Sequence, residues 1–432
     1  MEKFDENEQL RHDARKGLEM RLCAARPVAS REEYVKRLEY ELNFITDTGF
    51  ADCFLIAADF INWAKRNGIL VCPGFDSDAG SLIAWSLRIT DVDPLRFGLL
   101  FERFINPERV NSPDFSFVFC KGGRERVLAY VREKYDPDRI TQIHNPNDKY
   151  GMITLGNKRY SHTFFEAGIL LTLLRDTLDL IGKDYDFLSA IPIGDAATYE
   201  MLANGDAGGL FHNDEYFWGY ECDSGGMIRF LQKIKPDCID NLIAAISLYR
   251  SEPMGDVPCC IPRKQGKKKF DYSHPALEPI LKDTFGIFIY QEQFMRIARE
   301  MAGYTLGGAD LLRRVMRLRI INHVAKQKPI FMEGAAAKGV PLKTAYKLFT
   351  RMEKFAEYGV CKANAAAYAL CVYQAAYLKC HYRSEFMRAL ADLGVKMMIP
   401  VLKRCLRSGK IENQYDFELN ENYDKTGADK GE

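Results

Sequence analysis

Apolar and polar positions follow two different periods along the first 120 residues. Apolar residues recur at helical spacing over residues 10–22 and 34–42, and Ser30 with Glu33 has the spacing of an N-terminal capping box. An apolar segment, residues 82–87, follows a turn-rich loop at 71–81, so we expect a helix to begin there. Aromatic residues stand at every second position over residues 115–119, which predicts a strand.

The loop at residues 71–81 suggests one kind of chemistry. Small residues that lead into a helix leave backbone N–H groups free, and such groups suit a phosphate. The residues that we expect to line a phosphate site are Gly74, Ser77, Gly80 and Ser81. This pattern is common in proteins, so the loop alone does not establish a nucleotide site.

Composition limits the classes of partner. A chain of 432 residues that is 47% apolar can bury a sizeable core and should form more than one domain. Because the formal net charge is only +1, contact with a polyanion must come from local basic patches. The strongest basic run contains Arg263, Lys264, Lys267, Lys268 and Lys269. Such a run is usually a solvated loop, and contact with a DNA backbone is the alternative.

The absence of recognisable targeting segments and the spacing of the cysteines lead to an expected cellular compartment. We find no N-terminal signal peptide and no apolar run of membrane-spanning length, so we expect a cytoplasmic protein with no membrane partner. The twelve cysteines are scattered without C-x-x-C pairs, which favours reduced thiols over a zinc framework.

Several runs carry a specific resemblance to a known family. They are residues 89–95 (ITDVDPL), 100–110 (LFERFINPERV), 112–120 (SPDFSFVFC), 303–316 (GYTLGGADLLRRVM) and 365–369 (AAAYA). Together they resemble the alpha subunit of bacterial DNA polymerase III, the C-family of replicative DNA polymerases. In that family the loop reads G-P-G-R-G-S-G-A-G-S and the strand reads P-D-F-D-x-D-F.

The resemblance implies an α/β fold, with a nucleotidyltransferase-like mixed-sheet palm, a large helical fingers domain and a reduced thumb. We expect the following division: 1–48 helical linker, 49–143 first part of the palm, 144–190 thumb-like insert, 191–273 second part of the palm, 274–395 fingers and 396–432 extension and tail. Within the insert we expect a helical stretch over 161–181. We find no segment that resembles the family's metal-dependent phosphoesterase-like domain, its clamp-binding domain or its C-terminal oligonucleotide-binding domain.

The resemblance also places the metal site, and at this site the chain departs from its family. The family's strand carries two aspartates on one face, which hold two Mg²⁺ ions, and Ser116 and Val118 occupy those two positions. A valine cannot bind Mg²⁺, and a serine is a poor neutral substitute. The remaining candidate carboxylates are Asp114, which precedes the pair, and Asp256, which best matches a third palm carboxylate. Mg²⁺ is therefore expected only if the protein is active.

The nucleotide site departs in the same way. Phe75 stands where the family has arginine, and Asp76 and Asp78 stand where it has glycine. We expect these aspartates to be solvated turn residues, with a replacement carboxylate pair as the alternative. Arg313, Arg314 and Lys362 match family residues near the triphosphate and are the candidate contacts for a deoxynucleoside triphosphate.

Three functional hypotheses follow. The chain is a degenerate polymerase core that folds without incorporating nucleotides, or a weakly active DNA polymerase that uses the remaining carboxylates. The third is a non-catalytic module that binds DNA or a protein partner, and this hypothesis is compatible with the first.

Overall fold

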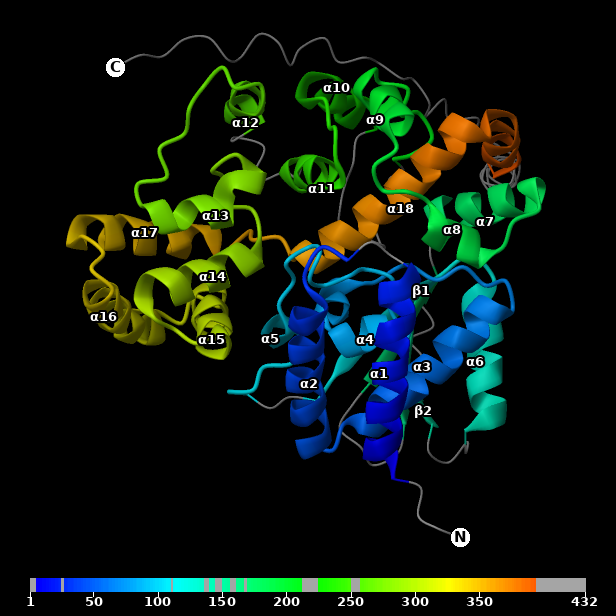
Figure 1. Ribbon diagram of the computed structural model, residues 1–432, viewed down its shortest axis with the longest axis horizontal. Coiled ribbons are helices and arrows are strands. Elements are labelled where there is room, and N and C mark those ends of the chain that lie inside the picture. The colour runs from blue at the N-terminus through cyan, green and yellow to red at the C-terminus, as the bar shows by residue number, and fades with distance from the viewer. Residues whose placement is uncertain are drawn as a thin grey trace, which may run out of the picture.

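The computed structural model describes residues 5–24, 27–109, 112–135, 140–143, 150–155, 161–166, 169–211, 224–249 and 257–393. Asp256 and the predicted polar tail lie outside the described residues. The fold is rich in helices and carries one sheet (Figure 1). Within the described part of the chain, no helix is long and apolar enough to cross a bilayer.

The two helices predicted near the N-terminus are confirmed as α1 (Glu6–Ala24) and α2 (Arg31–Asp47). The helix α3 (Ala51–Arg66) follows them. The capping box at the start of α2 is also confirmed, because Ser30 Oγ accepts the Glu33 N–H while the Glu33 carboxylate accepts the Ser30 N–H. Leu38, Leu42 and Ile45 form the buried face of α2, as helical spacing requires.

The sheet is mixed and has four strands. They are β1 (Asp114–Phe119), β2 (Ile140–Ile143), β3 (Tyr150–Leu155) and β4 (Ser161–Glu166), in the order β1-β4-β3-β2. β4 runs parallel to β1, with Ser116 opposite Thr163 and Val118 opposite Phe165, while the other two pairings are antiparallel. The helix expected over 161–181 is therefore wrong for its first six residues, and only α7 (Ile169–Ile181) is helical.

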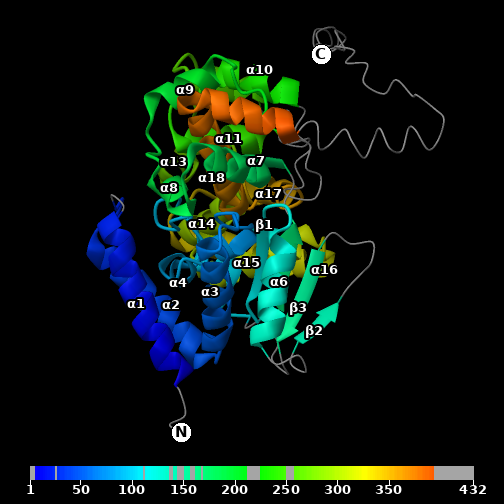
Figure 2. The same cartoon turned by 90° about the vertical axis from the view of Figure 1, so that its right-hand side faces the viewer.

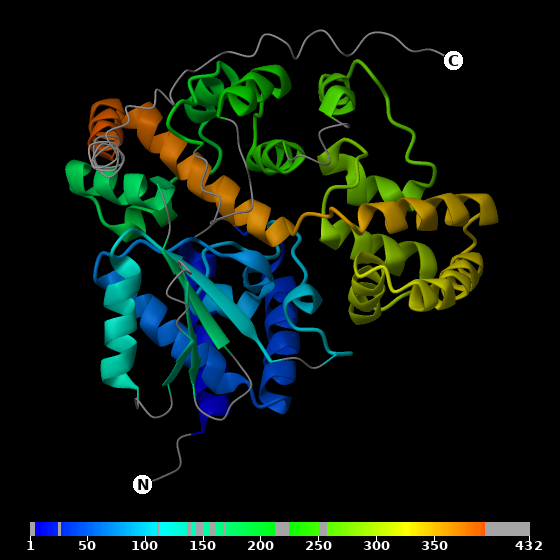
Figure 3. The ribbon, with the colours of Figure 1, turned by 180° about the vertical axis from the view of Figure 1, so that it is seen from behind.

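Alternation along β1 places Phe115 and Phe117 against α3. The Phe54 and Phe115 rings meet edge to face with centroids 5.1 Å apart, and Phe60 meets Phe117 in the same way at 5.1 Å. The helices α3 and α6 (Gly123–Lys134) lie on this side of the strand (Figures 2 and 3). The opposite face of β1, which carries Asp114, Ser116 and Val118, is the one on which the resemblance places the metal site.

The rest of the described chain is built mainly from helices. In chain order they are η1 (Asp76–Gly80), α4 (Leu82–Ser86), α5 (Phe101–Phe104), α8 (Tyr185–Ala190), α9 (Ala196–Ala203), α10 (Ser224–Ile234), α11 (Ile239–Leu248), α12 (Val257–Lys264), η4 (Pro275–Leu277), α13 (Glu278–Leu281), η5 (Lys282–Thr284), α14 (Gln291–Ala302), α15 (Leu306–Arg317), α16 (Ile321–Ala337), α17 (Leu342–Phe355) and α18 (Lys362–His381).

Two hydrophobic clusters organise these helices. A smaller cluster holds α13 to α17 together, and Phe294, Phe331, Phe349 and Phe355 are its fully buried aromatic residues. A larger cluster joins α1, α2, α3, β1, α7 and α11 with α18. Figure 1 shows α14 to α17 gathered on one side, with α18 leading away from them toward α9 and α7. The two clusters meet where η1, α5, α15 and the start of α18 come together.

A buried ionic centre at Asp91 ties α1 and α3 to α8, which follows the sheet in the chain. Its carboxylate accepts hydrogen bonds from Arg21 of α1 (2.8 Å), Lys65 of α3 (2.7 Å) and the hydroxyl of Tyr185 of α8 (2.6 Å). Burial alone would raise the pKa of Asp91, but the charges of Lys65 and Arg21 hold it well below its usual range. The buried lysine thus depends on a single carboxylate for its charge balance.

Replacing Asp91 by Asn should lower the free energy of unfolding by about 3–5 kcal/mol, because Lys65 and Arg21 would stay buried without a counter-charge. Asp186→Asn is the matched control, since Asp186 pairs with Arg88 at the surface and should cost less than about 1 kcal/mol. Urea denaturation measures both values. Equal losses in the two variants would contradict the role given to Asp91.

Asp91→Asn and the unmodified protein should also differ in how their stability changes at acid pH. Because the folded-state pKa of Asp91 is lowered, its stabilising contribution is complete above the ordinary carboxyl pKa of about 4 and is lost as the pH falls below that value. Asp91→Asn should therefore lose less stability than the unmodified protein as the pH falls from about 5 to about 2. Parallel acid profiles would show that Asp91 is not the group responsible.

Candidate active site

The residues of β1 at and before the expected metal positions become more buried along the strand. Asp114 is exposed, Ser116 is half-buried and Val118 is fully buried. The backbone carbonyl of Val118 accepts the N–H of Cys72 at 2.8 Å, which joins the start of the 71–81 loop to the strand. Position 118 is thus closed to any ligand, and position 116 offers one hydroxyl.

Asp78 is not the solvated turn residue that the sequence predicted. It is buried, 2% exposed, and its carboxyl accepts the backbone N–H groups of Phe75 and Ser116. Burial, followed by the charge of Asp76, raises the pKa of Asp78 well above its usual range. Burial therefore disfavours a charged carboxylate beside the first of the two former metal positions.

Asp76 behaves as predicted for a turn residue. It is exposed, has φ of +56°, and lies 3.6 Å from the Arg103 guanidinium. That left-handed conformation favours glycine, which is the family residue at this position, and aspartate tolerates it better than most other residues. Asp76 is exposed and lies next to Arg103, whereas Asp78 is buried, so the two carboxylates do not face solvent as a pair.

Of the residues proposed for a phosphate, the two glycines have packing roles. A Cβ on Gly74 would lie 2.8 Å from the Ala79 Cβ, and one on Gly80 would lie 2.8 Å from the Leu100 carbonyl oxygen. Ser77 is half-buried in the 3-10 helix η1. Close packing is therefore sufficient reason for these small residues, whether or not a ligand binds.

The helix start behind the loop is already occupied by a buried carboxylate. Glu41 of α2 accepts the N–H of Leu82 at 2.8 Å, the N–H of Ile83 at 3.2 Å and the Ser81 hydroxyl at 2.9 Å. Arg37 donates to the same carboxylate at 2.6 Å. Burial raises the pKa of Glu41, against the opposing effect of Arg37 and the N–H groups. The N–H groups that suggested a phosphate site are thus satisfied from within the chain.

The start of α18 has the same arrangement. The buried carboxylate of Glu292 accepts the backbone N–H of Lys362 at 2.9 Å and that of Ala363 at 3.4 Å. The Lys362 ammonium lies 5.4 Å from the centre of the Tyr290 ring. Burial lowers the pKa of Lys362, partly offset by the charge of Asp240. Glu292 and Glu41 were both missed in the sequence, since their partners lie about 40 or more residues away.

The two arginines of α15 share one buried partner. Arg313 donates to Asp310 through Nε (3.0 Å) and a terminal nitrogen (2.7 Å), and Arg314 donates to the other Asp310 oxygen at 2.8 Å. Arg313 is 3% exposed, while the Arg314 side chain is 33% exposed. The Asp310 charge therefore offsets much of the positive charge that the sequence proposed for a triphosphate.

The basic run divides into internal and exposed parts. Arg263 donates to the carbonyl of Phe285 at 2.9 Å, and Lys264 binds Asp237 at 3.0 Å. The three that follow, Lys267, Lys268 and Lys269, are exposed in the loop after α12. Within the described part of the chain, none of these three has a side-chain hydrogen bond or ion pair. Only this trio of the run is free to meet a polyanion.

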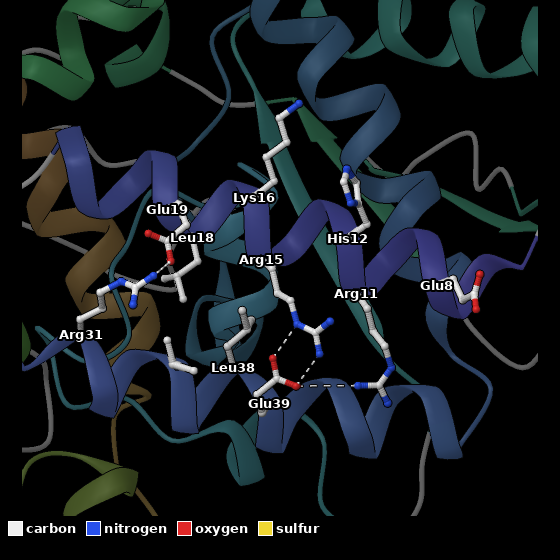
Figure 4. A pocket seen from close by; sticks show the side chains of 11 residues that line it. Glu8, Arg11, His12, Arg15, Lys16, Leu18, Glu19, Arg31, Leu38 and Glu39 are labelled. Carbon is white, nitrogen blue, oxygen red and sulfur yellow. Dashed lines mark hydrogen bonds and ion pairs between the residues drawn. The ribbon is translucent and has the colours of Figure 1, made fainter.

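A groove with a volume of about 710 Å³ lies between α1 and α2 (Figure 4). Ion pairs cross it, from Arg15 to Glu39 at 2.7 Å and from Arg31 to Glu19 at 2.6 Å. Its lining includes no residue from the 71–81 loop, β1 or α15. The groove is therefore separate from the candidate active site and is already neutralised by its own pairs.

Comparison with known proteins identifies the family. Residues 8–150 match the bacterial DNA polymerase III alpha NTPase domain, and residues 170–339 match the bacterial DNA polymerase III alpha subunit finger domain. The DNA polymerase III subunit alpha of Caulobacter vibrioides is 36% identical, over 90% of this chain and 43% of the relative. That of Rickettsia felis is 35% identical over 90% and 42%, and that of Pseudomonas aeruginosa is 33% identical over 92% and 44%.

These alignments show how much of each relative the chain spans and where their lengths differ. The chain spans less than half the length of these relatives. The alignment with the Caulobacter protein runs over 497 positions, more than the 432 residues of this chain. The relative must therefore contain residues inside the matched region that this chain lacks.

Substitution of Glu41 tests whether its carboxylate stabilises the start of α4. Glu41→Ala should lower the free energy of unfolding by about 3–5 kcal/mol, because Arg37 and the N–H groups of α4 lose a buried partner. Glu41→Gln keeps an oxygen acceptor of the same size and should cost clearly less. Thermal or urea unfolding gives the comparison, and a Glu41→Ala protein as stable as the unmodified one would show that the contact is dispensable.

Proposed function

Because the chain belongs to the family of bacterial DNA polymerase III alpha subunits, we propose that it is a polymerase core that retains the scaffold but does not incorporate nucleotides. The observation that carries this proposal is the state of β1, where Val118 is fully buried and Ser116 is neutral. The family resemblance places two metal-binding aspartates at those positions. A chain that kept the chemistry would need anions there.

The residues present do not fit a pair of Mg²⁺ ions. Mg²⁺ takes hard oxygen ligands, usually carboxylates, and two-metal catalysis needs anions that hold the ions about 3.5–4 Å apart. Asp114 is exposed and precedes the first metal position by two residues, and burial raises the pKa of Asp78. Among the described residues, no group of three potential metal ligands lies at β1 or the 71–81 loop. We therefore derive no catalytic step through bound metal.

Changes around the triphosphate positions support the same proposal. Phe75, at the family's arginine position, packs against the larger hydrophobic cluster. Arg313 and Arg314 are paired with Asp310, and Lys362 is desolvated beside Tyr290. Each of these groups would have to leave an internal contact before it met a phosphate. We infer that a deoxynucleoside triphosphate gains little binding energy at this site.

The architecture suggests a division of the chain along family lines. We assign residues 49–143 and 191–273 to a palm, 274–395 to fingers, and 144–190 to a reduced thumb, although β3 and β4 lie in the sheet of β1. The extra residues of the relative inside the matched region fit the loss of thumb structure. A shorter thumb would remove contacts to duplex DNA and the phosphate neutralisation that they provide. Family membership also makes the cytoplasm the proposed location.

A second candidate function, which is compatible with the first, is binding of DNA without catalysis. The observation in its favour is the exposed trio Lys267, Lys268 and Lys269, which has no internal carboxylate partner among the described residues. Three adjacent lysines can neutralise backbone phosphates without reading sequence. Arg263 and Lys264 are committed to internal contacts and would add little.

Primer extension tests the main proposal. Purified protein, with a primed template, deoxynucleotides and either Mg²⁺ or Mn²⁺, should give no extension above a mock purification, because the metal positions carry no anions. An intact alpha subunit of the same family is the positive control. Extension that disappears in an Asp114→Asn variant would establish the weakly active polymerase instead and would end the proposal.

A salt-dependent gel shift tests the second candidate. Replacing Lys267, Lys268 and Lys269 by Gln should weaken binding to duplex DNA and reduce the slope of log K against log salt by up to about 3, roughly one per phosphate contact. The control removes the same charge at three exposed lysines elsewhere, Lys16, Lys36 and Lys121, and should leave the slope unchanged. Equal effects of the two triple variants would show only a general loss of charge.

A further inference from the structure

Three potential metal ligands meet where α18 ends and α9 begins. The carboxylate of Asp195 lies 2.9 Å from Nε2 of His381, and one ligand atom each from Asp195, Cys380 and His381 lies within 4.8 Å of the other two. Asp195 and Cys380 are half-buried, and His381 is exposed, so an ion could enter from solvent. Among the described residues this is the only such group of three.

Neighbouring side chains already orient these ligands. The Asp195 carboxylate accepts both the backbone N–H of Thr198 at 2.9 Å and its hydroxyl at 2.6 Å, as the N-cap of α9. The Tyr377 ring lies against the His381 ring, with centroids 4.2 Å apart. Groups that fix the orientation of metal ligands in this way raise the affinity of a site, because less freedom is lost on binding.

The donor set selects the class of ion. A thiolate, an imidazole and a carboxylate are the three types of ligand that Zn²⁺ takes in proteins, and three protein ligands leave a fourth position for water. Soft sulfur donors disfavour Mg²⁺ and Mn²⁺ relative to Zn²⁺ and Co²⁺. The two anions, Asp195 and the Cys380 thiolate, would balance the charge of a divalent ion.

We propose that Asp195, Cys380 and His381 form a binding site for a thiophilic divalent cation, of which Zn²⁺ is the expected occupant. Binding replaces the hydrogen bond between His381 and Asp195 with bonds from both residues to the ion, and Cys380 gives its thiol proton to solvent. The bound ion joins the first turn of α9 to the last turn of α18, a helix that also contacts η1. This site is remote in sequence from β1 and is independent of the proposed loss of polymerase activity.

Cobalt titration tests the site. The full chain, freed of metal with a chelator and kept reduced, should bind one Co²⁺ with a thiolate-to-cobalt charge-transfer band, and Zn²⁺ should displace it and abolish the band. Cys380→Ser should remove the band and weaken Zn²⁺ binding by at least roughly tenfold. Removing a group that only orients a metal ligand already costs about that much, and Cys380 is itself a proposed ligand. Cys23→Ser, at an exposed cysteine outside the group, is the matched control and should bind normally.

Further readouts separate a lost ligand from a lost fold. Zn²⁺ should raise the melting temperature of the unmodified protein and of Cys23→Ser, but not that of Cys380→Ser or His381→Asn, whose circular dichroism without metal should match the unmodified protein. No band in the unmodified protein, or a band that persists in Cys380→Ser, would overturn the proposal. Magnesium in place of zinc should have no effect on the melting temperature.

Discussion

Buried carboxylates that are satisfied from within the chain are the constraint on which the candidate site depends. Glu41 accepts the N–H groups at the start of α4, and Glu292 does the same at the start of α18. A helix start offers unpaired N–H groups and a positive end of the dipole, so it attracts one anion. Where a side chain of the same protein supplies that anion, a phosphate can enter only by displacing it. The starts of α4 and α18, two helices that contact η1 in the 71–81 loop, therefore hold the scaffold together instead of presenting donors to a ligand.

The arginines near the site are also paired with partners from the same chain, and β1 has lost its expected charges. Arg313 and Arg314 share Asp310, and Arg103 lies between Gln291 and Asp76. On β1 the former metal positions carry a buried valine and a serine that lies beside the buried Asp78. Isolated ionised groups in such an interior would cost several kcal/mol each, so an internally balanced arrangement is the stable one. Scaffold contacts thus remain while the free charges needed for metal and triphosphate are missing.

Local patterns in the sequence were sufficient for much of the fold. Helical spacing predicted α1 and α2, the Ser30–Glu33 box predicted the start of α2, and aromatic alternation predicted β1. Residues 161–166 were mistaken for helix although one strand partner, β3, precedes them directly; the other partner, β1, lies more than 40 residues earlier. Strand pairing of that kind depends on contacts that periodicity along one segment does not report.

The site was harder to predict, because most of its contacts join residues that are far apart in the chain. The pairing of Asp310 with Arg313 and Arg314 has i, i+3 and i, i+4 spacing, so the sequence did contain that signal. The burial of Asp78 could not be read locally, since the strand residue that covers it is Ser116. Glu41 and Glu292 are likewise defined only by their distant partners.

Calorimetric titration of the purified protein with a deoxynucleoside triphosphate, in the presence and absence of Mg²⁺, tests the central claim most directly. An internally satisfied pocket predicts no metal-dependent heat at ligand concentrations that saturate an intact alpha subunit of the same family. Metal-dependent binding with one nucleotide per chain, lost on replacing Asp114 by Asn, would show that the site still holds its ions and would contradict the account.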